Sequence, residues 1–202
     1  MILCSIAGFL GSGKTTLVID LSRRLAGEGR KVAIIVNEIG EVGVDGALMS
    51  AYGLQMKEIT EGCICCALSN TLMNTLQQLA KEYDPDVVFI EPTGVALPSK
   101  INKVVRTSLV EFDKKFSVCL VDAYRAPRIN REAGAFFATQ IKGSNLIVIS
   151  KIELVDSMEL VSVIDMVRSI NPKAKIHTLS ARNNLGVDAL KNIILGESVE
   201  GG

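Results

Sequence analysis

The segment at residues 8–15, Gly-Phe-Leu-Gly-Ser-Gly-Lys-Thr, has the spacing of a phosphate-binding loop, G-x-x-x-x-G-K-T. Its glycines let consecutive backbone N–H groups point at phosphate oxygens, while Lys14 can bridge the β- and γ-phosphates of a nucleotide. The Thr15 hydroxyl is suited to bind Mg²⁺. An apolar run precedes the loop and a helical pattern follows it, which is the order that the motif requires. We therefore predict nucleotide contacts from six residues, Gly11, Ser12, Gly13, Lys14, Thr15 and Thr16.

Two further segments carry acidic residues suited to the same chemistry. Glu91 closes an apolar run and begins the sequence Glu-Pro-Thr-Gly that ends at Gly94. An acidic residue at the end of a strand can hold Mg²⁺ or orient water, and Gly94 lets its backbone approach a γ-phosphate. The acid- and glycine-rich segment 37–46 has the composition of a switch that brings Glu38 and Glu41 to the nucleotide, with an ordinary solvated loop as the alternative. We predict a catalytic group of Lys14, Glu38 and Glu91.

The sequence Cys63-Ile64-Cys65-Cys66 places three thiols within four residues, which indicates a soft-metal site or redox chemistry. Three thiolates are one short of a closed tetrahedral zinc site, so Glu38, Glu41, water or a partner protein can supply the fourth ligand. Redox chemistry and buried structural cysteines are the alternatives.

The remaining cysteines have a different context. Cys4 and Cys119 lie inside apolar runs, and we expect them in the core. Thiol catalysis is disfavoured because the single histidine, His177, lies on another predicted strand.

Composition narrows the class of protein. The chain has 202 residues, 48% of them hydrophobic, and a net charge of +0 from 22 basic and 22 acidic residues. This length and composition favour one domain over residues 1–202, and the charge gives no sign of nucleic-acid binding. We find neither a membrane span nor an export signal and therefore predict a cytoplasmic protein with reduced cysteines.

Apolar runs alternate with helical patterns along the whole chain, and this alternation predicts an α/β fold with a mostly parallel sheet and helices on both faces. Ligands of such folds bind at the carboxyl ends of the strands. The predicted strands are 2–7, 31–36, 55–59, 86–90, 116–121, 145–149 and 175–179. The predicted helices are 14–27, 67–82, 98–110, 128–141, 157–170 and 186–194.

Taken together, these motifs and their order resemble the CobW-type GTPases, which are relatives of the nickel-insertion GTPases HypB and UreG. The resemblance rests on the phosphate loop, Asn37–Glu41, Gly62–Cys66, Glu91–Gly94 and Val121–Ala123. It implies a P-loop fold of the SIMIBI class, slow GTP hydrolysis, and delivery of Zn²⁺, Co²⁺ or Ni²⁺ to a client metalloenzyme or cofactor-assembly protein. It also implies that Cys63, Cys65 and Cys66 bind the metal, with a contribution from the switch glutamates. By analogy, two copies pair across the nucleotide face.

The chain departs from the family pattern in two ways that matter here. We expect no second, C-terminal CobW-type domain. The guanine-reading Asn-Lys-x-Asp is replaced by Ser150, Lys151, Ile152 and Glu153, in which Glu153 keeps the carboxylate but adds a methylene, and Ser150 lacks the amide that fixes the loop. The segment with Ser180 and Ala181 resembles the second base loop, whose backbone N–H meets the guanine O6.

We therefore predict that GTP is favoured over ATP with weakened selectivity. An ATP-dependent metabolite kinase and a thiol-sensing regulatory module remain the alternatives.

Overall fold

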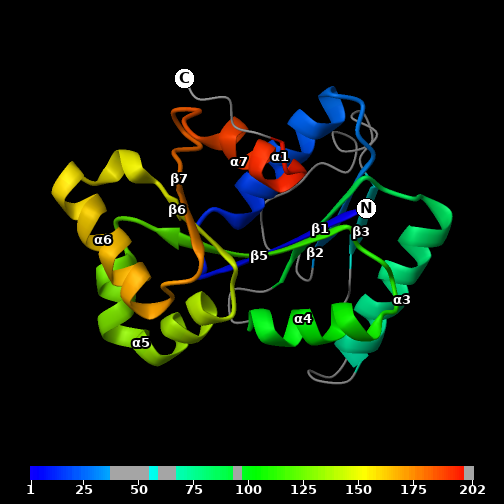
Figure 1. The fold of residues 1–202 in the computed structure, drawn as a ribbon, viewed down its shortest axis with the longest axis horizontal. Coiled ribbons are helices and arrows are strands. Elements are labelled where there is room, and N and C mark those ends of the chain that lie inside the picture. Colours follow the sequence, from blue (N-terminus) through cyan, green and yellow to red (C-terminus); the bar gives the residue numbers. More distant parts are fainter. Residues whose placement is uncertain (37–54, 59–66, 93–96, 198–202) are drawn as a thin grey trace.

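The computed structural model describes residues 1–36, 55–58, 67–92 and 97–197. Its centre is a seven-stranded sheet in which every neighbouring pair is parallel (Figure 1). Across the sheet the order is β3 (Gln55–Glu58), β2 (Val32–Val36), β4 (Val87–Glu91), β1 (Ile2–Gly8), β5 (Lys114–Asp122), β6 (Leu146–Ser150) and β7 (Lys175–Thr178). The predicted α/β class with a parallel sheet is confirmed.

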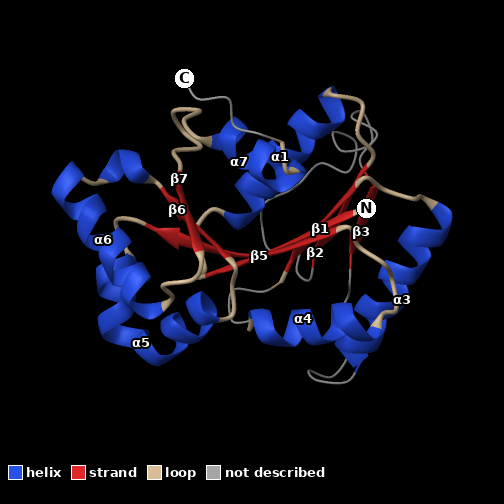
Figure 2. Ribbon diagram, viewed as in Figure 1, coloured by secondary structure: helices blue, strands red, loops and turns tan. Residues whose placement is uncertain are grey.

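Helices cover both faces of the sheet, as predicted (Figure 2). On one face lie α1 (Lys14–Gly27) and α7 (Val187–Leu195). On the other lie α3 (Ala67–Glu82), α4 (Pro98–Thr107), α5 (Ala126–Lys142) and α6 (Ser157–Ile170). A 3₁₀ turn, η1 (Ile152–Leu154), links β6 to α6.

The two faces follow from side-chain alternation along the strands, because successive residues of a strand point to opposite sides. In β1, Cys4 and Ile6 pack with α1 and α7, whereas Leu3 packs with α3 and α4. In β5, Cys119 and Val121 pack with α5 and α6. The strands are therefore apolar along nearly their whole length, as parallel strands buried on both faces require.

The structure corrects the limits of three elements, and the other described ends lie within one residue of their predicted positions. The helix predicted to reach residue 110 ends at Thr107, because Leu109 has a φ of 57° in the left-handed region. Strand β5 begins at Lys114, two residues before the predicted start. Helix α5 begins at Ala126 because Pro127 suits a first turn, and it bends at Ala133 (φ −138°, ψ 36°).

Over the part of the chain that the structure describes, the helices are all too short or too polar to cross a membrane.

Candidate functional site

The predicted phosphate loop joins the carboxyl end of β1 to the first turn of α1. Gly8 has a φ of 149°, and a Cβ there would lie 2.5 Å from the carbonyl oxygen of Leu120, so only glycine fits. Gly13 is left-handed (φ 96°) and precedes α1 directly. Thr16 is exposed on that first turn, while Ser12 is buried with an Oγ that has no hydrogen-bond partner among the described residues. The N-terminus of α1, with its positive dipole end, therefore opens directly behind the loop.

Lys14 is buried beneath this loop. Its Nζ donates hydrogen bonds to the carbonyl oxygens of Gly8 (3.1 Å) and Phe9 (3.3 Å). Burial lowers the pKa of Lys14, and the nearby charge of Glu91 acts in the opposite direction. The amine is thus a partly dehydrated cation at the position where the motif places the phosphates.

Thr15 and Glu91 meet across the sheet edge, since β4 is hydrogen-bonded to β1. The Thr15 hydroxyl donates to Glu91 Oε1 at 2.6 Å, while the buried Glu91 Oε2 has no hydrogen-bond partner among the described residues. Burial raises the pKa of Glu91, although the Thr15 hydrogen bond and the charge of Lys14 both favour the carboxylate. A hydroxyl and a carboxylate oxygen held together in this way fit Mg²⁺, which binds oxygen ligands.

Glu91→Gln is expected to raise the melting temperature of the nucleotide-free protein and to lower its rate of nucleotide hydrolysis by about 100-fold or more. The raised pKa means that the folded state prefers neutral Glu91, so the parent loses stability relative to the variant as pH rises through that pKa. Melting curves at pH 5 and pH 8 measure this difference, which should be larger at pH 8. Glu111→Gln, at an exposed glutamate, is the control and should change neither quantity. A variant that melts below the parent at pH 8 would contradict the argument.

Two basic residues from outside the phosphate loop hold it in place. Arg125, just before α5, donates from Nη1 to the carbonyl oxygen of Leu10 (3.0 Å). Lys151 donates from Nζ to the carbonyl oxygen of Gly11 (2.7 Å) and forms an ion pair with Asp122 (2.8 Å). These contacts fix the backbone of the loop before any phosphate is bound.

The aromatic ring of Phe9 anchors the start of the same loop. It packs edge-on against Phe136 with 5.5 Å between ring centroids, and lies 6.1 Å from Phe137. Both partners belong to the part of α5 that follows the bend at Ala133.

Ser150 also contacts the phosphate loop. Its buried hydroxyl lies 3.2 Å from the carbonyl oxygen of Ser12 and 3.3 Å from that of Val121. The hydroxyl can donate to either, so Ser150, which lacks the amide of the family pattern, still has a hydrogen bond available to the loop.

The two segments predicted to read the base lie together at the carboxyl edge of β6 and β7. The backbone N–H of Ile152 donates to the carbonyl oxygen of Leu179 at 3.5 Å, which brings Glu153 beside the turn with Ser180 and Ala181. Glu153 is half-buried, and its Oε2 has no hydrogen-bond partner among the described residues. A carboxylate with a buried, unpaired oxygen suits the N–H groups of a purine edge.

The rest of the predicted site lies outside the described residues, namely Glu38, Glu41, Cys63, Cys65, Cys66 and Gly94. Among the residues that are described, no three His, Cys, Asp or Glu side chains come together as a metal site. Cys4 and Cys119 are buried in the core, as predicted.

A parallel sheet of this order, with a phosphate loop between β1 and α1, defines a P-loop nucleotide-binding domain. Residues 2–178 match the model of the CobW/HypB/UreG nucleotide-binding domain, and the chain belongs to this family. The predicted SIMIBI-class fold is thereby confirmed.

Relatives and solved structures agree with this assignment. The chain is 35% identical over 148 residues to the zinc chaperone YeiR of Escherichia coli K12, covering 72% of this chain and 45% of YeiR. Among solved structures it is similar to HypB from Archaeoglobus fulgidus (TM-score 0.72, 20% identity, 97% and 89% of the two chains). It is also similar to the Zn(II)-bound YjiA GTPase of E. coli (TM-score 0.64, 26% identity, 88% and 57%). The chain spans about half the length of the curated relatives it matches.

Proposed function

We propose that this chain is a GTP-hydrolysing metal-binding domain that delivers Zn²⁺ to a client metalloprotein. The observation that carries the proposal is the hydrogen bond between Thr15 and Glu91 beside the buried amine of Lys14, within a family of nucleotide-binding domains. Relatives described as zinc chaperones and as a zinc-regulated GTPase metalloprotein activator favour zinc over Co²⁺ or Ni²⁺ as the cargo.

Each residue of the predicted site has a separate task in this proposal. Lys14 pairs with the β- and γ-phosphates, and the loop N–H groups bind their oxygens. Thr15 and Glu91 hold Mg²⁺, which when bound neutralises the charge that develops on the transferred phosphoryl group. Glu38 orients the attacking water, and Gly94 contacts the γ-phosphate. Arg125 and Lys151 keep the loop in the shape that binds.

The register of the sheet supports a link between the nucleotide and the metal. Val36 at the end of β2 is paired with Glu58 at the end of β3 and with Glu91 at the end of β4. Adjacent strands lie about 4.8 Å apart, so the chain leaves toward Glu38 from the strand next to that of Glu91, and toward Cys63 from the strand one further along the same edge. We propose that the nucleotide state changes the affinity of the cysteine segment for metal through this shared edge.

We propose that the base is guanine and that Glu153 accepts hydrogen bonds from its edge. Glu153→Asp should increase the preference for GTP over ATP by roughly 5- to 10-fold, because the shorter side chain restores the reach of a bidentate pair worth about 1–3 kcal/mol. Competition binding of GTP and ATP to parent and variant measures the change. Equal preferences in parent and variant would show that Glu153 does not read the base.

A second copy of the chain is the partner that the nucleotide face favours, alongside the client protein. Leu10 in the loop is 81% exposed and Tyr124 before α5 is 66% exposed, and Arg125 connects the two segments. Exposed apolar side chains on one rim are typical of interfaces. Mass in solution with and without a GTP analogue and Zn²⁺ tests this pairing.

Multiple-turnover assays with GTP and ATP, with and without Zn²⁺, test the proposed function as a whole. The proposal expects slow, Mg²⁺-dependent hydrolysis of GTP that responds to Zn²⁺. ATP turnover that requires a small-molecule acceptor would instead support a kinase, and binding without turnover would support a regulatory module.

A further inference from the structure

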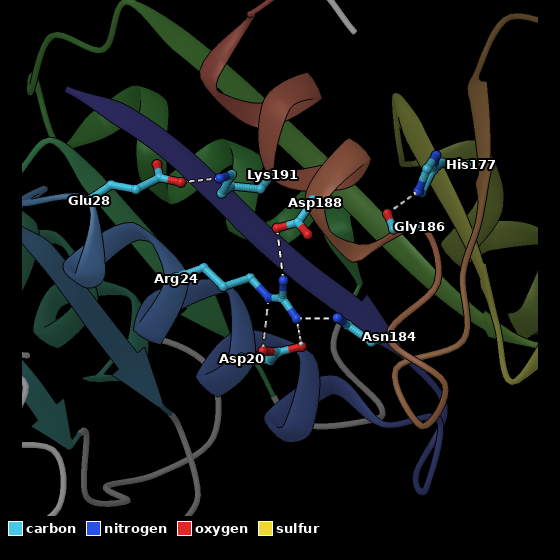
Figure 3. Close-up of polar contacts among 8 residues, drawn as sticks. All are labelled: Asp20, Arg24, Glu28, His177, Asn184, Gly186, Asp188 and Lys191. Atoms are coloured by element: carbon cyan, nitrogen blue, oxygen red, sulfur yellow. Dashed lines mark hydrogen bonds and ion pairs between the residues drawn. The ribbon is translucent and has the colours of Figure 1, made fainter. Parts of the chain in front are cut away.

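The last turn of α1 is joined to the turn between β7 and α7 by one arginine. We call residues 180–186 the base turn. Arg24 bonds from Nε to Asp20 Oδ1 (3.0 Å) on its own helix, and from Nη1 to Asp188 Oδ1 (2.8 Å) on α7. Its Nη2 donates to Asn184 Oδ1 within the base turn (Figure 3). A single guanidinium thus contacts α1, the base turn and α7 at once.

The shape of the base turn is set by its own backbone. Ser180 and Leu185 exchange N–H···O bonds of 3.0 and 2.9 Å. Asn184 (φ 54°) and Gly186 (φ 77°) are left-handed, and His177 Nε2 lies 2.7 Å from the carbonyl oxygen of Gly186. These contacts close the turn but do not relate it to the phosphate loop.

Arg24 supplies that relation, because α1 begins at Lys14 of the phosphate loop and is a continuous helix up to Gly27. A helix is a rigid spacer, so a side chain in the last turn of α1 lies at a fixed distance from the phosphate loop at the start of that helix. The planar fork of arginine suits two acceptors in fixed directions, which a lysine ammonium does not reproduce.

We propose that Arg24 is a positioning residue that holds the base turn, and with it Ser180 and Ala181, at the distance from the phosphate loop that guanine nucleotides need. The inference rests on the proposed nucleotide binding and adds a residue that acts on the base without touching it. A backbone N–H of the base turn faces O6 of guanine, which accepts, whereas adenine has a donor amine at that position. Misplacing the turn therefore costs guanine binding more than adenine binding.

The molecule offers a matched control between the same two helices. Lys191 on α7 pairs with Glu28 at the end of α1, one helical turn beyond Arg24 (Figure 3). Both Lys191 and Arg24 thus join the C-terminal end of α1 to α7. Unlike Arg24, the Lys191–Glu28 pair bonds to no described residue of the base turn. Removing the Lys191–Glu28 pair therefore measures what the docking of α7 on α1 alone contributes to nucleotide affinity.

The experiment compares Arg24→Ala, Lys191→Ala and Asn184→Gly in the full chain by calorimetric titration with GDP and ADP. Asn184→Gly removes the amide but keeps the left-handed backbone available. Arg24→Ala and Asn184→Gly should each weaken GDP binding about tenfold, as expected for loss of one charge-assisted hydrogen bond that orders a binding turn, and should lower the GDP to ADP preference. Lys191→Ala should change both affinities less than about twofold, since the pair joins α7 to the end of α1 and bonds to neither the phosphate loop nor the base turn among the described residues. The Arg24/Asn184 double variant should be no weaker than the single ones.

The outcomes separate this inference from the proposed function. If the parent binds GDP and Arg24→Ala behaves like Lys191→Ala in the GDP to ADP preference, Arg24 only docks α7 and the inference is overturned. If Arg24→Ala unfolds, Asn184→Gly still decides the question. This variant is expected to lose preference for GDP over ADP, and an unchanged preference would refute the positioning role of Arg24. If the parent binds neither nucleotide, the proposed function fails and Arg24 has nothing to position.

Discussion

Lys14→Ala is expected to abolish tight binding of nucleoside triphosphates, with a loss of affinity of about 100-fold or more from the removed charge-assisted hydrogen bonds. The amine is buried and already lies between the carbonyl oxygens of Gly8 and Phe9, so it is in place before the phosphates arrive. Burial lowers the pKa of Lys14, which means that the folded protein holds this cation at a cost in desolvation. Phosphate oxygens that bind the ammonium group offset that cost, whereas the alanine side chain has no group that can bind them.

Calorimetric titration with a non-hydrolysable GTP analogue measures the effect. Lys142→Ala, at an exposed lysine that ends α5, is the control and should bind as the parent does. An unchanged affinity in Lys14→Ala would mean that the segment 8–15 does not bind phosphates.

The second large effect concerns the metal. The reduced protein should bind about one Zn²⁺ or Co²⁺ per chain, and Co²⁺ should show sulfur-to-metal charge-transfer absorption in the near ultraviolet. Replacing Cys65 and Cys66 by serine should remove this absorption. The structure excludes two other sources, because burial raises the pKa of Cys4 well above its usual range and that of Cys119 to about 12. Thiols that stay protonated inside the core do not supply thiolate ligands.

Cys119→Ala is accordingly the control for the titration and should keep the absorption. Ligand thiols must lose protons to bind, so the affinity should fall as pH drops below about 6. Exchanging GDP for a GTP analogue should shift it as well. A Co²⁺ absorption that remains after both serine substitutions would refute thiolate binding by this segment. A metal affinity that is the same with GDP and with the GTP analogue would show a metal site that does not respond to the nucleotide.

The sequence predicted the parts of the fold and site that local pattern determines. Apolar runs located most of the described strands. The loop motif identified Lys14 and Thr15, because its spacing places these two side chains at the phosphates and at Mg²⁺. Glu91 was recognisable since it closes an apolar run. The limits of α4 were less predictable because the helical pattern continues past Thr107, and only the left-handed backbone at Leu109 stops it.

Contacts between elements that are distant in the sequence were not predicted. Arg125 and Arg24 look like ordinary surface arginines, because nothing local shows that one reaches the carbonyl oxygen of Leu10 and the other the side chain of Asn184. The contact of the Ser150 hydroxyl with the loop was not predicted for the same reason, since it depends on how closely β6 approaches Ser12. Only Arg125 had a weak signal, its place just past the carboxyl end of a strand that pairs with β1.

The position of β1 within the sheet also determines when, during synthesis, the chain becomes able to bind a nucleotide. Ile2 pairs with Val87 and Lys114, so β1 has no sheet neighbour until β4 has been made and is enclosed on both sides only after β5. The loop that follows β1 is held from outside by Arg125, Ser150 and Lys151, which are made later still. Nucleotide capture therefore comes late in synthesis, because a nascent chain that stalls before β6 has β4 and β5 to pair with β1 but lacks Ser150 and Lys151, which hold the loop.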